Sequence, residues 1–320
     1  MEAMLLRPAY KDYLWGGTRL KSDYGKKTDM MTLAESWECS VHPDGPSVVA
    51  SGQFKGQTLI EVLDAHPEFI GSKAKDTGFP LLVKFIDAAQ NLSVQVHPGD
   101  EYAGENEQQR GKTEMWYVLD AKPGAELICG FKHDITPEQL KKDAAAGTLT
   151  KHLLHVKVQK GDVFLIPAGT VHAIGAGILL VEIQENSNVT YRIYDYNRTD
   201  KDGNRRELHI DKAIEIMDMK ARKDVRQKPR FVRFQQGASR EILSRCRYFD
   251  TERIMVSMGV DFSVLDTSFQ VLLCTEGNGR ISCGDMELPL KFKRGDCIFI
   301  PAGIGRCNVL GQAELIKVRC

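Results

Sequence analysis

The chain has 320 residues, and its 43 Lys and Arg residues balance its 43 Asp and Glu residues, so its formal net charge at pH 7 is zero. This balance argues against a nucleic-acid-binding or membrane-surface protein, because the affinity of such proteins rests on a basic field. No apolar run approaches the roughly 18–20 residues of a membrane span, and Arg7 and Lys11 come too early for a secretory signal peptide. We therefore expect a soluble, cytoplasmic globular protein that is long enough for two domains.

Short strand-like segments dominate the chain. They are rich in β-branched residues and are separated by Gly, Pro and Asp, a pattern typical of an all-β sandwich or barrel. The clearest of them cover residues 80–88, 92–98, 114–121, 162–169, 177–185, 269–277 and 296–303.

Three helices are expected between these strands, and we expect them to cover one side of the sheets. The motif T-L-I-E at 58–61 is a capping box that opens a helix, which Pro67 ends. The motif T-P-E-Q at 136–139 is a second box, and Gly147 is a natural stop. Asp211 is expected to cap a third helix with an apolar stripe formed by Ile210, Ala213, Ile214 and Met217.

The third helix is followed by a basic stretch at 220–230 that contains no aromatic residue. Without interleaved aromatic residues, such a stretch is typical of a solvated linker. We place the domain boundary there, with a catalytic half at 1–222 and a C-terminal half at 223–320.

The eight cysteines include no C-x-x-C pair, and six of them lie in the last quarter, mostly in apolar strand-like runs. A disulfide framework would suit a small secreted chain better. We therefore expect buried, reduced thiols.

A nine-residue pattern occurs twice in the chain. G-D-x-x-x-I-P-A-G stands at 161–169 and again at 295–303, an offset of 134 residues. The pattern resembles the second conserved motif of the cupin superfamily, whose members are small antiparallel jelly-roll barrels. The resemblance implies a mainly β fold of two cupin barrels, a bicupin, with a few covering helices.

The two copies differ where the chemistry would lie. His172 stands three residues after the first copy and Arg306 three residues after the second. Aligning the flanking strands places Ser268, which is not a carboxylate, opposite Glu114. We expect one barrel to bind metal and the other to be structural.

The metal-binding barrel offers four donors. Gln95 and His97 share one strand face, as do Lys112 and Glu114, because alternate residues of a strand point the same way. With His172, the set Gln95, His97, Glu114 and His172 supplies two nitrogens and two oxygens, which suit zinc and would accept manganese, iron or cobalt. One carboxylate against a divalent ion leaves a charge of about +1, which favours an anionic intermediate. The other histidines match no ligand spacing, and we expect them to be structural.

The N-terminal two thirds carry more specific motifs. PLLVKFIDA at 80–88, LSVQVHP at 92–98, KTEMWY at 112–117 and NVTYRIYDY at 188–196 closely resemble the type I mannose-6-phosphate isomerases in their short bacterial form. WGG at 15–17, AESW at 34–37 and LHID at 208–211 also fit. The resemblance runs from about residue 7 to about residue 220, and the cupin repeat extends it to about residue 303. The chain lacks the large helical insertion of the long members.

This resemblance implies a zinc-dependent aldose–ketose isomerase that interconverts mannose 6-phosphate and fructose 6-phosphate through a cis-enediol. Arg192 and Lys112 are the implied catalytic residues, and Lys84, Lys112 and Arg192 are expected to contact substrate. Arg192 would hold the sugar oxygens or phosphate, or stabilise the enediolate; the alternative is a structural ion pair with Asp195. Lys84 lies in an apolar strand, so a ligand anion or a carboxylate such as Asp87 must compensate its charge.

Several alternatives stay open at the level of sequence. The proton-transfer base is Lys112, Glu185, Asp195 or a metal-bound water, and the three tryptophans are expected to be core residues. Competing functions are an iron-type cupin oxygenase, a non-catalytic sugar-responsive binding protein and a purely structural bicupin. The expected partner is a small phosphosugar, with neither nucleic acid nor membrane, and we expect a monomer with a dimer as the alternative.

Overall fold

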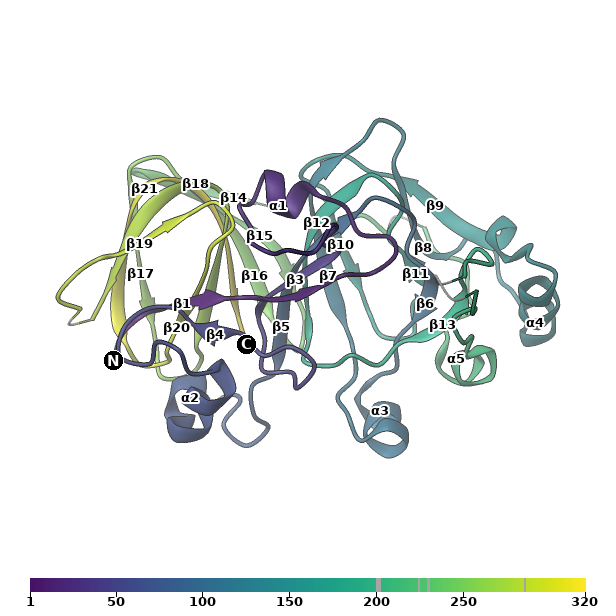
Figure 1. Cartoon of the computed structure of the whole chain (residues 1–320), viewed down its shortest axis with the longest axis horizontal. Helices are drawn as coiled ribbons and strands as arrows, with labels where there is room; N and C mark the ends of the chain where they lie inside the picture. The colour runs from purple at the N-terminus through teal and green to yellow at the C-terminus, as the bar shows by residue number, and fades with distance from the viewer. Residues whose placement is uncertain (200–202, 224, 229–230, 285) are drawn as a thin grey trace.

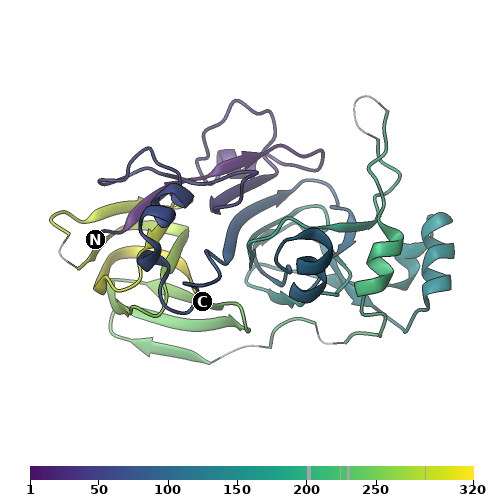
Figure 2. The same cartoon turned by 90° about the horizontal axis from the view of Figure 1, so that it is seen from below.

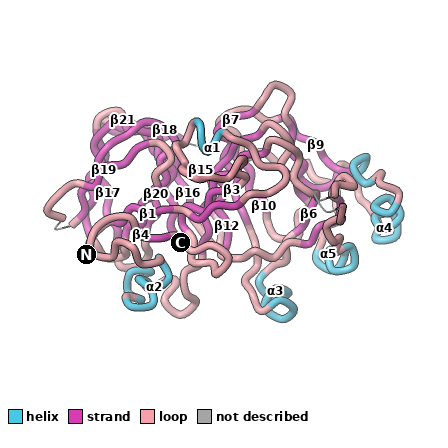
Figure 3. Tube along the Cα trace, in the orientation of Figure 1, coloured by secondary structure: helices cyan, strands magenta, loops and turns pink. Residues whose placement is uncertain are grey.

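The computed structural model describes residues 1–320 except 200–202, 224, 229–230 and 285. Figure 1 shows two β-rich units side by side, and Figure 2 shows the same two units from below. Strands predominate throughout, with helices on the outside (Figure 3). The mainly β prediction is therefore confirmed.

The first barrel is built from two antiparallel sheets, ordered β10-β7-β12-β5-β3-β2 and β13-β6-β11-β8-β9. Buried side chains from both sheets, such as Trp116 and Leu180 from one and Leu127 from the other, form a common core. The strands are β2 (Ala9–Lys11), β3 (Glu35–Cys39), β5 (Leu81–Ala88), β6 (Val94–Val96), β7 (Glu114–Ala121), β8 (Glu126–Phe131), β9 (Leu153–Lys157), β10 (Val163–Ile166), β11 (His172–Ala173), β12 (Ile178–Glu185) and β13 (Tyr191–Tyr194).

The second barrel is a ten-stranded sheet in which β14-β15-β16-β21-β18-β20-β1-β4 follow one another, while β17 pairs with β21 and β19 with β18. Two of its strands, β1 and β4, come from the N-terminal part of the chain. They join the sheet through β1, which pairs with both β20 and β4. The strands are β1 (Met4–Arg7), β4 (Val48–Val49), β14 (Val232–Gln235), β15 (Ala238–Arg245), β16 (Asp250–Val256), β17 (Gly259–Val264), β18 (Gln270–Cys283), β19 (Leu290–Lys293), β20 (Cys297–Ile300) and β21 (Gly305–Arg319).

The boundary at 222/223 stays a prediction. The strands β1 and β4 precede it in the chain but belong to the sheet of the second barrel. Of the basic stretch, Asp224, Pro229 and Arg230 lie outside the described residues. Its described part lies along the first barrel, where the Gln227 amide donates to the Val163 carbonyl and Arg226 pairs with Asp162 at 3.0 Å.

The three expected helices are present. Thr58 caps α2 (Leu59–Ala65) in a complete capping box, and Thr136 caps α4 (Pro137–Ala145) through its hydroxyl alone. The cap of α5 (Ile210–Ile216) is His209 and not Asp211, so the helix starts two residues earlier than predicted; the His209 amide donates to the Arg192 carbonyl there. Further short helices are α1 (Arg19–Ser22), α3 (Asp100–Glu107), and the 3-10 turns η1 (Pro67–Ile70) and η2 (Leu149–His152).

These helices do not cover a single side of the sheets, as the sequence had suggested. Leu140 of α4 and Ala213 of α5 pack on the outer face of the five-stranded sheet, whereas α2 packs into the core between the barrels. Figure 1 shows α2 below the left-hand barrel and the pair α4 and α5 at the right-hand end of the molecule. No helix among the described residues is long and apolar enough to cross a membrane.

The two barrels meet face to face through a large apolar layer. Phe85, Tyr117 and Val181 of the first barrel belong to the same buried cluster as Phe299 and Ile316 of the second. Burial of apolar area at about 25 cal/mol per Å² makes such a layer a strong constraint on how the barrels sit. The second barrel therefore supports the outer wall of the first.

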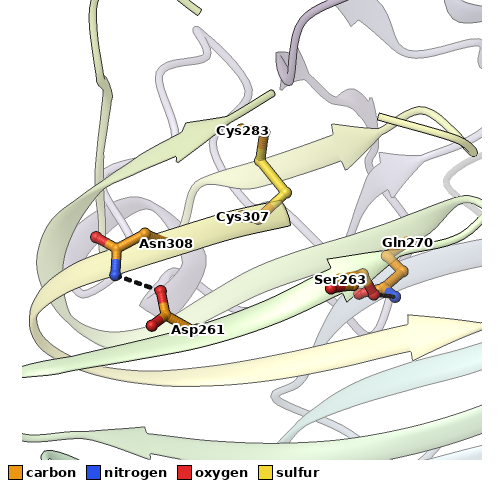
Figure 4. Close-up of a disulfide and its surroundings, with 6 residues drawn as sticks. All are labelled: Asp261, Ser263, Gln270, Cys283, Cys307 and Asn308. Atoms are coloured by element: carbon orange, nitrogen blue, oxygen red, sulfur yellow. Dashed lines mark hydrogen bonds between the residues drawn. A yellow bond between two sulfur atoms is a disulfide. The ribbon is translucent and has the colours of Figure 1, made fainter. Parts of the chain in front are cut away.

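The expectation that every thiol is reduced is wrong for one pair. Cys283 of β18 and Cys307 of β21 lie directly opposite each other and form a disulfide (Figure 4). They are 24 residues apart in sequence, and only the strand register brings them together. The other six cysteines, all described, are free thiols.

Strand pairing also corrects the alignment of the two barrels. Ile166 pairs with Glu114 in the first barrel, and its counterpart Ile300 in the repeat pairs with Gln270 in the second. Gln270, not Ser268, therefore stands in the place of Glu114. The shift of two residues keeps the same strand face. The Gln270 amide donates to the Ser263 carbonyl (Figure 4), so no carboxylate occupies the position.

The interior of the second barrel holds a charged group of three residues. The Glu252 carboxylate lies 3.0 Å from the Lys317 ammonium and 4.0 Å from the Arg240 guanidinium. Lys317 is buried, and the desolvation lowers its pKa. One acid thus lies between two bases.

The first barrel has the opposite arrangement at the equivalent positions. Lys84 lies between two acids, at 3.4 Å from Glu35 and 3.1 Å from Glu182. By strand pairing, Lys317 corresponds to Glu182. Lys317 pairs with a residue of β18, and Glu182 pairs with the equivalent residue of β7. Strand pairing likewise equates Glu252 with Lys84 and Arg240 with Glu35. The repeat has kept the ion group while inverting every charge.

Replacing Lys317 with Met should destabilise the protein by about 1–3 kcal/mol, because a largely buried carboxylate loses its nearest partner. Urea unfolding measures the effect, and Lys291→Met on the exposed face of β19 is the matched control. The double variant K317M/E252M should be less destabilised than the sum of the two single variants. Additive losses would contradict coupling within the group.

Candidate metal centre and cavity

Three side chains of the first barrel converge at a single point. His97, Glu114 and His172 are buried, and one ligand atom of each lies within 4.8 Å of the others. The His172 Nε2 atom is 3.2 Å from Glu114 Oε1, and the His97 Nε2 atom is 3.5 Å from Glu114 Oε2. His97 follows β6, while Glu114 and His172 open β7 and β11, so three strand ends hold the triad.

Hydrogen bonds behind the two imidazoles determine their tautomers. The Nδ1 atom of His97 donates to the Val189 carbonyl at 2.8 Å, and that of His172 donates to the Thr170 carbonyl at 2.8 Å. Both Nε2 atoms are therefore unprotonated and face Glu114. Burial lowers the pKa of His97 well below its usual value and that of His172 to about 4, so both rings are neutral ligands at pH 7.

The chemistry of these donors fits a divalent cation. Glu114 Oε1 is buried and accepts no hydrogen bond from the described residues, and its neighbour His172 Nε2 offers only a lone pair. Burial raises the pKa of Glu114, although Lys112 opposes the shift. Lone pairs that face one another away from water repel unless a cation lies between them. His97, Glu114 and His172 thus form a metal-binding triad.

Gln95, the fourth predicted ligand, lies beside this triad. It pairs with His172 across β6 and β11, and its amide nitrogen is 3.5 Å from His172 Nε2. A half-turn of the amide exchanges its nitrogen and oxygen, which would direct the oxygen to the ion. Its role as a ligand stays a prediction.

A cavity of about 310 Å³ opens next to the triad. The four residues Lys84, Gln95, Lys112 and Arg192 that the sequence placed in the site all line it. Its wall is completed by Tyr13, Trp15, Glu35, Ile86, Leu92, Ser93, Ile174, Glu182, Asn188, Thr190, Arg206 and His209.

Lys112 is the cavity residue nearest to the triad. Its ammonium lies 3.0 Å from His97 Nε2 and 3.1 Å from Glu114 Oε2. Lys112 precedes β7 and shares the strand face of Glu114, as the sequence predicts. It can therefore reach both a ligand of the ion and a molecule in the cavity.

Carboxylates that the sequence did not single out compensate the charge of Lys84. Its partners are Glu35 and Glu182, and not Asp87, which pairs with Arg19 at 2.6 Å on the opposite strand face. Burial alone lowers the pKa of Lys84, but the two carboxylates outweigh it and raise the pKa. Glu182 is a charged residue within an apolar strand, like Lys84. The same sequence pattern could therefore have identified it as a site residue.

Two buried tryptophans orient these carboxylates. The indole of Trp116 donates to Glu182 at 2.9 Å, and that of Trp37 donates to Glu35 at 2.6 Å. Both rings are core residues, as expected. The third tryptophan, Trp15, is buried and also forms part of the cavity wall.

Arg192 reaches the cavity without an ion pair to Asp195. Its side chain donates to the Ser93 hydroxyl at 3.2 Å and to the Glu207 carbonyl at 3.1 Å. Asp195 pairs instead with Arg198 and Arg206. The alternative predicted for Arg192, an ion pair with Asp195, is therefore absent from the described residues.

Two of the candidate bases do not line the cavity. Asp195 is held by its two arginines, and Glu185 accepts a hydrogen bond from the Thr113 amide at 2.8 Å. Glu185 also bonds to Asp100, which in turn bonds to Tyr248 of the second barrel. This cluster links the barrels, and none of its carboxylates lines the cavity.

Glu185 should make stability depend on pH. Burial raises its pKa to about 7, the Thr113 amide opposes the shift, and Asp100 adds to it. Because the folded-state pKa lies above the unfolded value, this contribution is complete below about pH 4.5 and is lost as pH rises through 7. Urea unfolding of wild type and Glu185→Gln measures it. As pH rises through this range, the free energy of unfolding of wild type should fall relative to that of the variant. A constant difference between the two would rule the effect out.

The comparisons with known proteins agree with this geometry. A family model described as the catalytic domain of phosphomannose isomerase type I matches residues 4–135, and one for the mannose-6-phosphate isomerase cupin domain matches residues 240–320. The chain is 39% identical over 316 residues to mannose-6-phosphate isomerase ManA of Bacillus subtilis, covering 98% of each protein. It is 36% identical over 315 residues to mannose-6-phosphate isomerase of Streptococcus mutans, covering 98% of this chain and 97% of the relative.

A solved structure extends the match to the whole fold. The crystal structure of mannose 6-phosphate isomerase from Bacillus subtilis matches with a TM-score of 0.91 at 34% identity, over 99% of both chains. The resemblance inferred from the motifs is confirmed along its full length: this chain belongs to the type I phosphomannose isomerases.

Proposed function

We propose that the cavity interconverts mannose 6-phosphate and fructose 6-phosphate with the help of one divalent ion. The observation that carries this proposal is the buried triad of His97, Glu114 and His172 beside a cavity lined by lysine and arginine. A sugar phosphate needs both features, a cation for its reacting oxygens and positive side chains for its phosphate.

The reaction moves protons between two neighbouring carbons. One proton leaves C2 and one is delivered to C1, while the proton of the C2 hydroxyl passes to O1. Negative charge gathers on O1 and O2 in the cis-enediol, and a bound divalent ion would stabilise this charge as a Lewis acid. We propose zinc, held by His97, Glu114, His172 and Gln95, with manganese, cobalt or iron as substitutes.

Three cationic side chains have proposed roles. Lys112 stands next to the ligand Glu114, so it can hydrogen-bond the sugar oxygens and exchange a proton there. Arg192 lines the cavity and forms no ion pair among the described residues, so its charge can hold the phosphate of the substrate. Lys84, whose ammonium is paired with two carboxylates, contacts the sugar from the wall of the cavity. We further propose a cytoplasmic monomer that acts on small phosphosugars.

The test is turnover of mannose 6-phosphate in a coupled assay, on the protein as purified, after chelation, and after zinc or manganese is restored. Chelation should abolish turnover, and added metal should restore it. His172→Ala should lower the rate by about a thousandfold or more, because the ion loses a buried ligand. Metal content measured alongside should fall with it.

The matched control is His155→Ala, which removes a half-exposed histidine paired with Glu126 away from the triad. It should keep both metal and activity. No turnover in fully metal-loaded wild type would overturn the isomerase proposal and leave a metal-binding cupin with another substrate.

A further inference from the structure

The charges around the cavity are unevenly distributed. At the metal end lie three carboxylates, Glu35, Glu114 and Glu182, and two lysines, Lys84 and Lys112. This end has a surplus of one negative charge, which a divalent cation would convert to a positive one. The side chains there already neutralise one another at 3.1–3.4 Å, so the metal end has no spare cation for a phosphate.

The other end has the opposite surplus. Arg192, Arg198 and Arg206 lie near two carboxylates, the buried one of Asp195 and the exposed one of Glu207, which leaves one positive charge in surplus. Among the described residues no carboxylate forms an ion pair with Arg192. Burial lowers the pKa of Arg192 and nearby Arg206 lowers it further, while Asp195 and Glu207 offset only part of the shift. This positive surplus beside the cavity suits a phosphate anion.

Arg206 is held in position for such a ligand. Its guanidinium makes a two-point contact with Asp195, from Nε to Oδ2 at 2.8 Å and from Nη2 to Oδ1 at 2.5 Å. Asp195 is fixed in turn by Arg198, which also donates to the Asn91 carbonyl at 2.6 Å. Arg206 and Arg192 line the cavity, whereas Asp195 and Arg198 do not. The side chain of Arg206 remains 30% exposed, so a ligand can approach it.

We propose that Arg206, together with Arg192, binds the phosphate of the substrate and makes the enzyme specific for phosphorylated sugars, while Asp195 and Arg198 are positioning residues. This inference rests on the proposed function. With the phosphate at the arginine end, the six-carbon chain directs C1 and C2 toward the metal end. A free hexose lacks this anchor and loses the orientation as well as the affinity.

The test compares two substrates and one inhibitor in wild type and Arg206→Gln. The variant should raise the KM for mannose 6-phosphate about tenfold to a hundredfold with a small change in kcat, because a charge-assisted phosphate contact is lost. Turnover of unphosphorylated mannose, measured at high concentration in both proteins, should change much less than turnover of mannose 6-phosphate. Inorganic phosphate should inhibit wild type competitively, and its affinity for the variant should fall by a similar factor. Arg206→Lys, which keeps the charge without the planar fork, should fall between the two.

Arg306→Gln is the matched control, since it removes an exposed arginine paired with an aspartate in the second barrel. It should keep the kinetic constants of wild type. Asp195→Asn should raise the KM for mannose 6-phosphate while leaving turnover of free mannose unchanged, because it loosens the hold on Arg206. An unchanged KM and unchanged phosphate inhibition in Arg206→Gln would overturn this inference, whereas absence of turnover in wild type would overturn the proposed function instead. A variant that loses both substrates equally would show that Arg206 is only structural.

Discussion

The site depends on one constraint: the lone pairs of His172 Nε2 and Glu114 Oε1 face each other at 3.2 Å away from water. The main-chain carbonyls of Val189 and Thr170 hold the Nδ1 protons of His97 and His172, and this forces both Nε2 lone pairs toward Glu114. A low-dielectric interior makes such an arrangement costly unless a cation is bound. The strand ends that carry the triad are held by both sheets of the first barrel and by the apolar layer behind it, so the donors cannot move apart easily.

The two barrels handle buried charge in opposite ways. In the first barrel, Lys84 between Glu35 and Glu182 leaves a negative surplus beside a metal-binding triad. In the second, Glu252 lies between Arg240 and Lys317, and Gln270 occupies the place of Glu114. An interior with surplus positive charge and no carboxylate ligand disfavours a divalent ion. The inversion therefore explains, in electrostatic terms, how one copy of the repeat serves as a metal site and the other as its support.

The cavity that results has two electrostatic ends. Carboxylates outnumber lysines at the metal end, and arginines outnumber carboxylates at the other. A substrate with phosphate at one terminus and a carbonyl at the other fits this polarity in one direction only. Orientation is thus a consequence of where charges are left uncompensated, and not of any single contact.

The sequence by itself determined the mainly β fold, the repeated barrel and the residues His97, Glu114 and His172, because strand alternation and the spacing around a repeated turn are local properties. It also determined Lys84, Lys112 and Arg192 as cavity residues through family motifs. Only the tertiary structure decided which partner each charge has: Lys84 takes Glu35 and Glu182 in place of Asp87, and Asp195 takes Arg198 and Arg206 in place of Arg192. The disulfide of Cys283 and Cys307, the cap at His209 and the match of Gln270 with Glu114 were decided in the same way. Each depends on register between strands or segments distant in sequence, and a shift of even two residues changes the partner while the local pattern stays the same.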